Sequence, residues 1–188
     1  MDIFDDHLPR ALHLAQHIIK SRVLPGDLVV DATIGNGHDT LFLANLVGSE
    51  GKVIGFDIQA SAIQTTREKT IDFPQVELFH LGHEKVGSCL DGLPSAAMFN
   101  LGYLPGTDKQ IVTNPQTTLA ALDQLATPLL PKGVITIVLY TGHDGGAEEA
   151  AAVKAWGQGL DQSLYTVIEY GFVNQKNTPP SLIVIERK

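Results

Sequence analysis

The sequence predicts an α/β fold: a Rossmann-like, mostly parallel sheet of seven strands that ends in an antiparallel hairpin, with helices on both faces. Three observations lead to this prediction. Short β-branched apolar segments alternate with segments of helical periodicity, a glycine-containing turn follows the first apolar segment, and only a short loop separates the last two strand-like segments. Alternating strands and helices imply right-handed crossovers and a parallel sheet, whereas a short loop permits only a hairpin.

The first part of the chain predicts one helix before the first strand. Apolar residues recur at helical spacing over 11–19, Pro9 suits a first helical turn, and Pro25-Gly26 ends the pattern. The segment DLVVD at 27–31 predicts a buried strand, and HDTLFLANLV at 38–47 predicts the helix that follows its loop.

The same alternation continues toward the C-terminus. We expect strands at 52–58, 76–79, 96–100 and 133–140, and helices near 60–70, 116–125 and 148–156. The hairpin strands are expected at 165–173 and 181–185, with NQKNTPP in the loop between them. A parallel sheet with such a hairpin is the architecture of class I methyltransferases, and other α/β enzymes share this coarse pattern.

Length and composition indicate a globular protein. The 188 residues suit a single domain spanning 1–188, and 44% hydrophobic with 18% charged residues is typical of a folded chain. No apolar run approaches the roughly 20 residues of a membrane span, so we expect no membrane partner. The N-terminal MDIFDDHLPR lacks the features of a secretory signal, which predicts a cytoplasmic location.

Charge and cysteine content narrow the function classes. The formal net charge of -8 argues against broad, sequence-independent binding of nucleic acid, but it leaves room for a local RNA site. Cys89 is the single cysteine, so it forms no intramolecular disulfide and supports no zinc-finger spacing.

A glycine turn, DATIGNGHDT at 31–40, lies between the first strand and its helix, where an open α/β sheet binds ligands. Two glycines let the backbone approach a ligand, and the helix start offers N–H groups to a carboxylate, so an amino-acid-like cofactor fits. A plain tight turn is the alternative, and Thr40 replaces the third glycine of a dinucleotide fingerprint. The candidate cofactor-binding residues here are Asp31, Thr33, Gly35, Asn36, Gly37, Asp39 and Thr40.

An acidic residue follows the second predicted strand. Asp57, in the segment FDIQ, lies 22 positions after Gly35. In this fold class a carboxylate about 20 residues beyond the glycine turn accepts hydrogen bonds from ribose hydroxyls. We therefore assign Asp57 to a ribose and the neighbouring Gln59 to the same cofactor, with a helix N-cap as the alternative role of Asp57.

Five segments carry a resemblance to a known family. DATIGNGHDTLFLA, FDIQ, FNLGYLPG, YTGHDGG and NQKNTPP, in this order and spanning almost the whole chain, resemble a small bacterial family labelled "putative rRNA methylases". The broader methyltransferase superfamily often has a glycine where this chain has Thr33, but the smaller family shares its DAT-x-GNG pattern.

The resemblance implies a class I methyltransferase fold and S-adenosylmethionine as the cofactor. Characterised members of that family methylate the 5-aminomethyl group of a modified wobble uridine in tRNA, which forms 5-methylaminomethyl-(2-thio)uridine. The implied partner is therefore the tRNA anticodon region, and a homodimer is left open.

The segment FNLGYLPG follows the fourth predicted strand and resembles a relaxed Asn-Pro-Pro-Tyr motif of amino-group methyltransferases. An amine that attacks a methyl group must hold its lone pair in line with the sulfonium, and Asn100 with a nearby backbone carbonyl can hold the N–H groups. Tyr103 is expected to pack against the uracil ring. Leu101 and Gly102 replace the two prolines and, with Pro105, are expected to border the substrate; a turn-capping Asn100 and a core Tyr103 form the alternative.

Histidines follow the third and fifth predicted strands. The resemblance makes His83 and Glu84 cofactor neighbours, and His83 and His143 are both candidate acceptors of the substrate proton. The His80-Leu-Gly-His83 spacing offers only two metal ligands, so we expect no metal.

Two further loops are expected to form the substrate rim. Tyr140 and His143 lie in YTGHDGG, while Asn174 and Lys176 lie in NQKNTPP. Ordinary loop roles are the alternative for both segments, because turns are rich in glycine, asparagine and proline.

Methyl transfer to the exocyclic amine of a wobble uridine is thus the leading hypothesis. A methyltransferase acting on ribosomal RNA or a small amine is the runner-up. An NAD-dependent oxidoreductase and a noncatalytic nucleotide-binding module are the remaining alternatives; the third-glycine position argues against the first and the Asn100 segment against the second.

Overall fold

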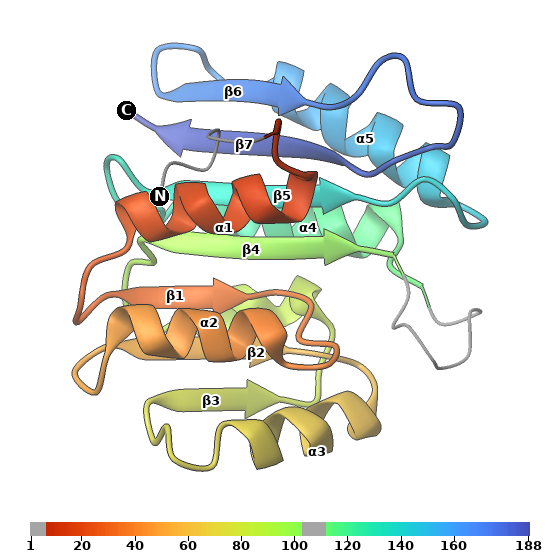
Figure 1. Ribbon diagram of the computed structural model, residues 1–188. Helices are drawn as coiled ribbons and strands as arrows, with labels where there is room; N and C mark the ends of the chain where they lie inside the picture. The colour runs from red at the N-terminus through yellow and green to blue at the C-terminus, as the bar shows by residue number, and fades with distance from the viewer. Residues whose placement is uncertain (1–6, 103–111) are drawn as a thin grey trace.

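The computed structural model describes residues 7–102 and 112–188, and seven strands in these ranges form one sheet (Figure 1). The strand order is β3-β2-β1-β4-β5-β7-β6. Strands β1 to β5 pair in parallel, while β7 is antiparallel to both β5 and β6. The strands are β1 (Leu28–Asp31), β2 (Lys52–Phe56), β3 (Val76–Phe79), β4 (Ala96–Leu101), β5 (Val134–Leu139), β6 (Tyr165–Tyr170) and β7 (Ser181–Arg187).

Helices cover both faces of this sheet. In Figure 1, α1, α2 and α3 lie on the near face, and α4 and α5 lie behind the sheet. None of the helices in the described ranges is long and apolar enough to cross a bilayer. The helices are α1 (Ala11–Arg22), α2 (His38–Val47), α3 (Ala60–Lys69), the 3-10 helix η1 (His83–Ser88), α4 (Pro115–Ala126) and α5 (Gly146–Gln158).

The central strands send alternate side chains into two different cores, as the pleat of a strand requires. In β1, Val29 packs with the apolar residues of α1 and α2, while Val30 packs in the core beneath α4. In β4, Met98 and Phe99 divide between the same two cores. Burial on both faces explains why these strands read as continuous apolar runs in the sequence.

The observed fold confirms the predicted Rossmann-like sheet and its closing hairpin. Most element bounds differ from the predicted ones by at most two residues, as at β2, which ends at Phe56 instead of 58; β6 ends at Tyr170, three residues before the predicted 173. Directly after β2, Asp57 N still donates to the Phe79 carbonyl oxygen of β3, and the Asp57 carboxylate accepts backbone N–H groups of the adjoining loops. The insertion of β7 between β5 and β6 was not predicted.

Candidate active site

A cavity of about 530 Å³ opens at the edge of the sheet where the parallel strands end. It lies between the loops that follow β1, β2, β3 and β4, with α1 contributing part of one wall. Eleven of the residues predicted for the site line this cavity: Thr33, Gly35, Asn36, Asp39, Asp57, Gln59, His83, Glu84, Asn100, Gly102 and Tyr140.

The glycine turn needs its glycines for backbone reasons. Gly35 has φ 52° and Gly37 has φ 76°, both in the left-handed region that side chains disfavour. A Cβ on Gly37 would also lie 2.5 Å from Thr66 Oγ1 of α3, far inside van der Waals contact. Gly37 therefore lets the turn and α3 approach each other, and it lies behind the cavity wall without lining it.

Asp57 joins the two loops at the carboxyl ends of β1 and β2. Its Oδ2 accepts a hydrogen bond from Gly35 N at 2.9 Å, and its Oδ1 accepts one from Gln59 N at 2.8 Å. Helix α3 begins at Ala60 and its N-cap is Gln59, so Asp57 is not the N-cap. Each carboxylate oxygen accepts more than one hydrogen bond, which leaves acceptor capacity for a ligand's hydroxyls.

Asp31 supports the same turn from inside the protein. It is fully buried at the end of β1, and its carboxylate accepts hydrogen bonds from Thr40 Oγ1 at 2.6 Å and Thr33 N at 3.2 Å. Burial, together with the neighbouring Asp39 carboxylate, raises the pKa of Asp31 to about 7. Asp31 and Thr40 do not line the cavity, so the structure places them behind the predicted cofactor contacts.

The raised pKa of Asp31 predicts a stability that falls as pH rises. From about pH 4 to about pH 7 the folded protein retains a proton that the unfolded chain releases. Each unit of pKa difference is equivalent to about 1.4 kcal/mol, so we expect a loss of several kcal/mol across this interval. Asp31→Asn is neutral throughout, and its free energy of unfolding, measured by urea denaturation, should fall less steeply. The exposed Asp72→Asn is the matched control; equal slopes for wild type and Asp31→Asn would contradict the assignment.

A chain of polar side chains orients Asn100 at the end of β4. Gln16 of α1 donates to Asp39 Oδ1 at 2.7 Å, and Asn100 Nδ2 donates to Asp39 Oδ2 at 2.5 Å. Because a carboxylate only accepts, this contact fixes which end of the Asn100 amide faces Asp39. The buried Oδ1 of Asn100 has no hydrogen-bond partner within 7–102 and 112–188. Such an acceptor is unfavourable unless a donor completes it, which a ligand at the cavity can do.

Three backbone groups around Asn100 are paired within the protein. Thr33 Oγ1 accepts a hydrogen bond from Asn100 N at 2.7 Å. The carbonyl oxygens of Leu101 and Gly102 accept from Tyr140 N and Thr113 N. Among the buried side-chain atoms of this segment that the structure describes, the Asn100 Oδ1 is thus an acceptor left for an incoming N–H.

His83 lies in the cavity wall with both ring nitrogens directed at protein groups. Nδ1 donates to the Ala32 carbonyl oxygen at 3.1 Å, and Nε2 lies 3.5 Å from Thr118 Oγ1. Its ring also packs edge-on against Phe99, and burial lowers its pKa. Neither nitrogen is presented to a substrate, so the structure argues against His83 as the direct proton acceptor.

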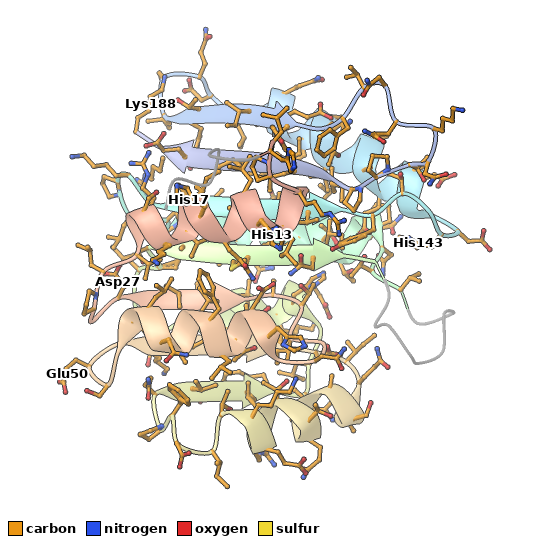
Figure 2. All side chains as sticks on the ribbon, in the orientation of Figure 1. His13, His17, Asp27, Glu50, His143 and Lys188 are labelled. Atoms are coloured by element: carbon orange, nitrogen blue, oxygen red, sulfur yellow. The ribbon has the colours of Figure 1, made fainter. Side chains whose placement is uncertain are left out.

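The structure places the residues predicted for the substrate rim in different environments. The prediction that Leu101 borders the substrate is wrong. Its side chain is 1% exposed and packs in the core, because it points to the face of β4 that α4 and α5 cover. Figure 2 shows His143 at the edge where the parallel strands end, beyond the cavity lining. Asn174 and Lys176 are exposed in the β6–β7 loop and do not line the cavity. Tyr103 and Pro105 lie outside the described residues.

Sequence reasoning missed several residues of the cavity. Ile58 and Leu81 line it although their side chains are 57% and 43% exposed, which is unusual for large apolar residues. Their positions directly after β2 and β3 were a usable signal, since ligands bind at this edge. Leu12 and Gln16 of α1 also line the cavity, and nothing in the local sequence marks them.

The cavity lining is acidic. Asp39, Asp57 and Glu84 contribute carboxylates, and no Lys or Arg is among the described lining residues. Such a site favours a ligand with cationic groups and disfavours the two phosphate charges of a dinucleotide. The described residues contain no group of three His, Cys, Asp or Glu side chains arranged to hold a metal ion.

The chain was compared with known proteins. Residues 53–186 match the model of the family described as "Putative rRNA methylase". The chloroplastic tRNA (mnm(5)s(2)U34)-methyltransferase of Arabidopsis thaliana is 36% identical over 203 residues, which cover 100% of this chain and 74% of that protein.

Solved structures give the same result. A "putative rRNA-methylase" from Clostridium thermocellum is 44% identical with a TM-score of 0.94, and the match covers 96% of this chain and 99% of that one. A "putative methyltransferase" from Streptococcus mutans, solved in complex with SAH, is 36% identical with a TM-score of 0.89 over the same shares of both chains. The chain therefore belongs to the "Putative rRNA methylase" family and has the fold of class I S-adenosylmethionine-dependent methyltransferases, as its motifs had predicted.

Proposed function

We propose that this protein transfers a methyl group from S-adenosylmethionine to the exocyclic amine of 5-aminomethyl-(2-thio)uridine at the wobble position of tRNA. As a member of its family the chain is an S-adenosylmethionine-dependent methyltransferase. The observation that carries the finer proposal is the buried Oδ1 of Asn100 at the cavity, which has no hydrogen-bond partner among the residues that the structure describes and is an acceptor suited to an amine N–H. The tRNA substrate is taken from the Arabidopsis relative.

The described residues fit S-adenosylmethionine. The acidic lining suits its sulfonium and ammonium groups, and Asp57 has acceptor capacity for the ribose hydroxyls. Ile58 and Leu81 offer exposed apolar surface beside Asp57 for the adenine ring. When bound, the cofactor supplies a methyl group on an activated leaving group.

The protein's own contribution is to orient the amine. Asn100 Oδ1 accepts one N–H of the neutral aminomethyl group, which directs the nitrogen lone pair away from the amide. Asp39 prevents the Asn100 amide from rotating, because the opposite orientation would place Oδ1 against a carboxylate oxygen. The acidic surroundings also attract the protonated form of the amine before it loses its proton.

An anticodon base is a physically suitable substrate. Loop bases are already unstacked, which reduces the free energy of extruding a base into a pocket. With a net charge of -8, the protein is expected to recognise RNA through a local surface instead of a broad basic one.

The experiment that tests this proposal compares three acceptors with labelled S-adenosylmethionine: undermethylated tRNA that carries 5-aminomethyluridine, ribosomal RNA, and a small primary amine. We expect transfer to the tRNA alone. Transfer to ribosomal RNA or to the small amine instead would support the runner-up functions, and binding of NAD without binding of S-adenosylmethionine would support an oxidoreductase.

Asp39→Asn is expected to lower kcat by about tenfold while the affinity for S-adenosylmethionine changes little. An amide at position 39 can pair with either orientation of Asn100, so the acceptor is no longer fixed toward the amine. Single-turnover kinetics with isothermal calorimetry separates the two effects. The exposed Asp72→Asn serves as the control, and a loss confined to cofactor affinity would show that Asp39 acts on the cofactor alone.

A further inference from the structure

Glu149 is a buried carboxylate in the first turn of α5. Its side chain is 1% exposed, Oε2 accepts a hydrogen bond from Thr113 Oγ1 at 2.5 Å, and Oε1 accepts one from Thr118 Oγ1 at 2.7 Å. The ion pairs found in the described ranges do not include it. Burying a carboxylate among neutral hydroxyls is less favourable than burying an apolar side chain, so packing alone does not explain this residue.

The first hydroxyl that donates to Glu149, that of Thr113, lies next to the segment that contains Asn100. Thr113 N donates to the Gly102 carbonyl oxygen at 3.0 Å, which ties the chain before α4 to the end of β4. Gly102 and Thr113 both line the cavity, and Gly102 lies two residues after Asn100. By accepting a hydrogen bond from the Thr113 hydroxyl, Glu149 fixes the position of Thr113 in its hydrogen bond with Gly102.

The second hydroxyl that donates to Glu149 belongs to Thr118, beside His83. Thr118, fully buried in α4, has its Oγ1 3.5 Å from His83 Nε2, and His83 Nδ1 binds the Ala32 carbonyl oxygen after β1. The single proton of the Thr118 hydroxyl goes to Glu149, the closer and charged acceptor. The neutral His83 ring then has an acceptor at Nε2, so its 3.5 Å approach to Thr118 Oγ1 is a packing contact and not a hydrogen bond through which Glu149 acts.

We propose that Glu149 is a positioning residue that holds the substrate-side wall of the active-site cavity in place through the Gly102–Thr113 hydrogen bond. It contacts neither substrate nor cofactor and acts through the Thr113 hydroxyl, while Thr118 fixes its other carboxylate oxygen. The expected effect of Glu149 on the reaction rate rests on the proposed function. The expected effect of Glu149 on the Gly102–Thr113 hydrogen bond does not.

Amide hydrogen exchange of Thr113, followed by NMR on the full chain, tests the proposal without any substrate. Glu149→Ala should lower the protection of the Thr113 amide by about ten- to a hundredfold, because its hydroxyl loses a charged partner. Glu149→Gln keeps an acceptor for one threonine and a donor for the other, so it should restore most of the protection. The neighbouring Glu148→Gln, exposed in the same helical turn, is the matched control and should leave the protection unchanged.

Kinetics adds a second readout. We expect kcat/KM for the tRNA to fall in parallel with the protection of the Thr113 amide across these variants. Thr113→Val removes only the Thr113 hydroxyl contact and should show the same loss of protection and of kcat/KM as Glu149→Ala. It therefore tests the proposal even if Glu149→Ala folds poorly. Unchanged Thr113 protection in Glu149→Ala and Thr113→Val, or a protection loss spread evenly over all strands in both, would overturn the proposal. A wild-type protein inactive on the tRNA would overturn the proposed function and leave the exchange result to decide the role of Glu149.

Discussion

Asn100→Ala is expected to lower kcat by about a hundredfold, with little change in the affinity for S-adenosylmethionine. The substitution removes the buried Oδ1 acceptor and leaves the amine without the contact that aims its lone pair. It also leaves Asp39 Oδ2 without the Nδ2 donor, but Gln16 continues to bind the other oxygen. Rapid-quench turnover with tRNA, combined with calorimetry of cofactor binding, measures both quantities.

The matched control for this change is Asn45→Ala, because Asn45 is exposed on α2 and bonds only within its own helix. Normal turnover of Asn100→Ala would contradict the assignment of Asn100 to the amine. A loss of cofactor affinity equal to the loss of turnover would instead place Asn100 among the cofactor contacts.

Asp57→Ala is expected to weaken S-adenosylmethionine binding by about a hundredfold. The change removes the ribose acceptor and leaves Gly35 N and Gln59 N without their partner, so the two loops around the cofactor lose one of the hydrogen bonds that join them. Asp57→Asn retains one acceptor oxygen and should show an intermediate loss. Calorimetric titration with S-adenosylhomocysteine gives the affinities directly.

The exposed Asp72→Ala should bind the cofactor as wild type does, which separates the role of Asp57 from that of surface charge. If Asp57→Ala and Asp72→Ala bound S-adenosylhomocysteine equally well, the ribose assignment would be wrong.

Features that depend on neighbours in the sequence could be predicted. The alternation of strands and helices, the glycine turn and the spacing from Gly35 to Asp57 are all local or periodic signals, and they located the sheet and one edge of the cavity. The same periodicity could not show that β7 lies between β5 and β6, because two antiparallel strands can pair with the sheet in either order.

Contacts between distant parts of the chain could not be predicted. Asn100 meets Asp39 across 61 positions, and Asp39 meets Gln16 across 23. Nothing in the sequence around Glu149 distinguishes it from its exposed neighbour Glu148, yet the fold buries one and exposes the other. Leu101 shows the converse error, since a motif position was assigned to substrate although the pleat of β4 turns its side chain into the core.

The most direct test of the central claim is mass spectrometry of nucleosides from undermethylated tRNA incubated with the protein and S-adenosylmethionine. We expect the 5-aminomethyl-(2-thio)uridine nucleoside to gain the mass of one methylene group with the wild-type protein and to stay unchanged with Asn100→Ala. No gain on that nucleoside, in a protein that binds S-adenosylmethionine, would contradict the proposed substrate.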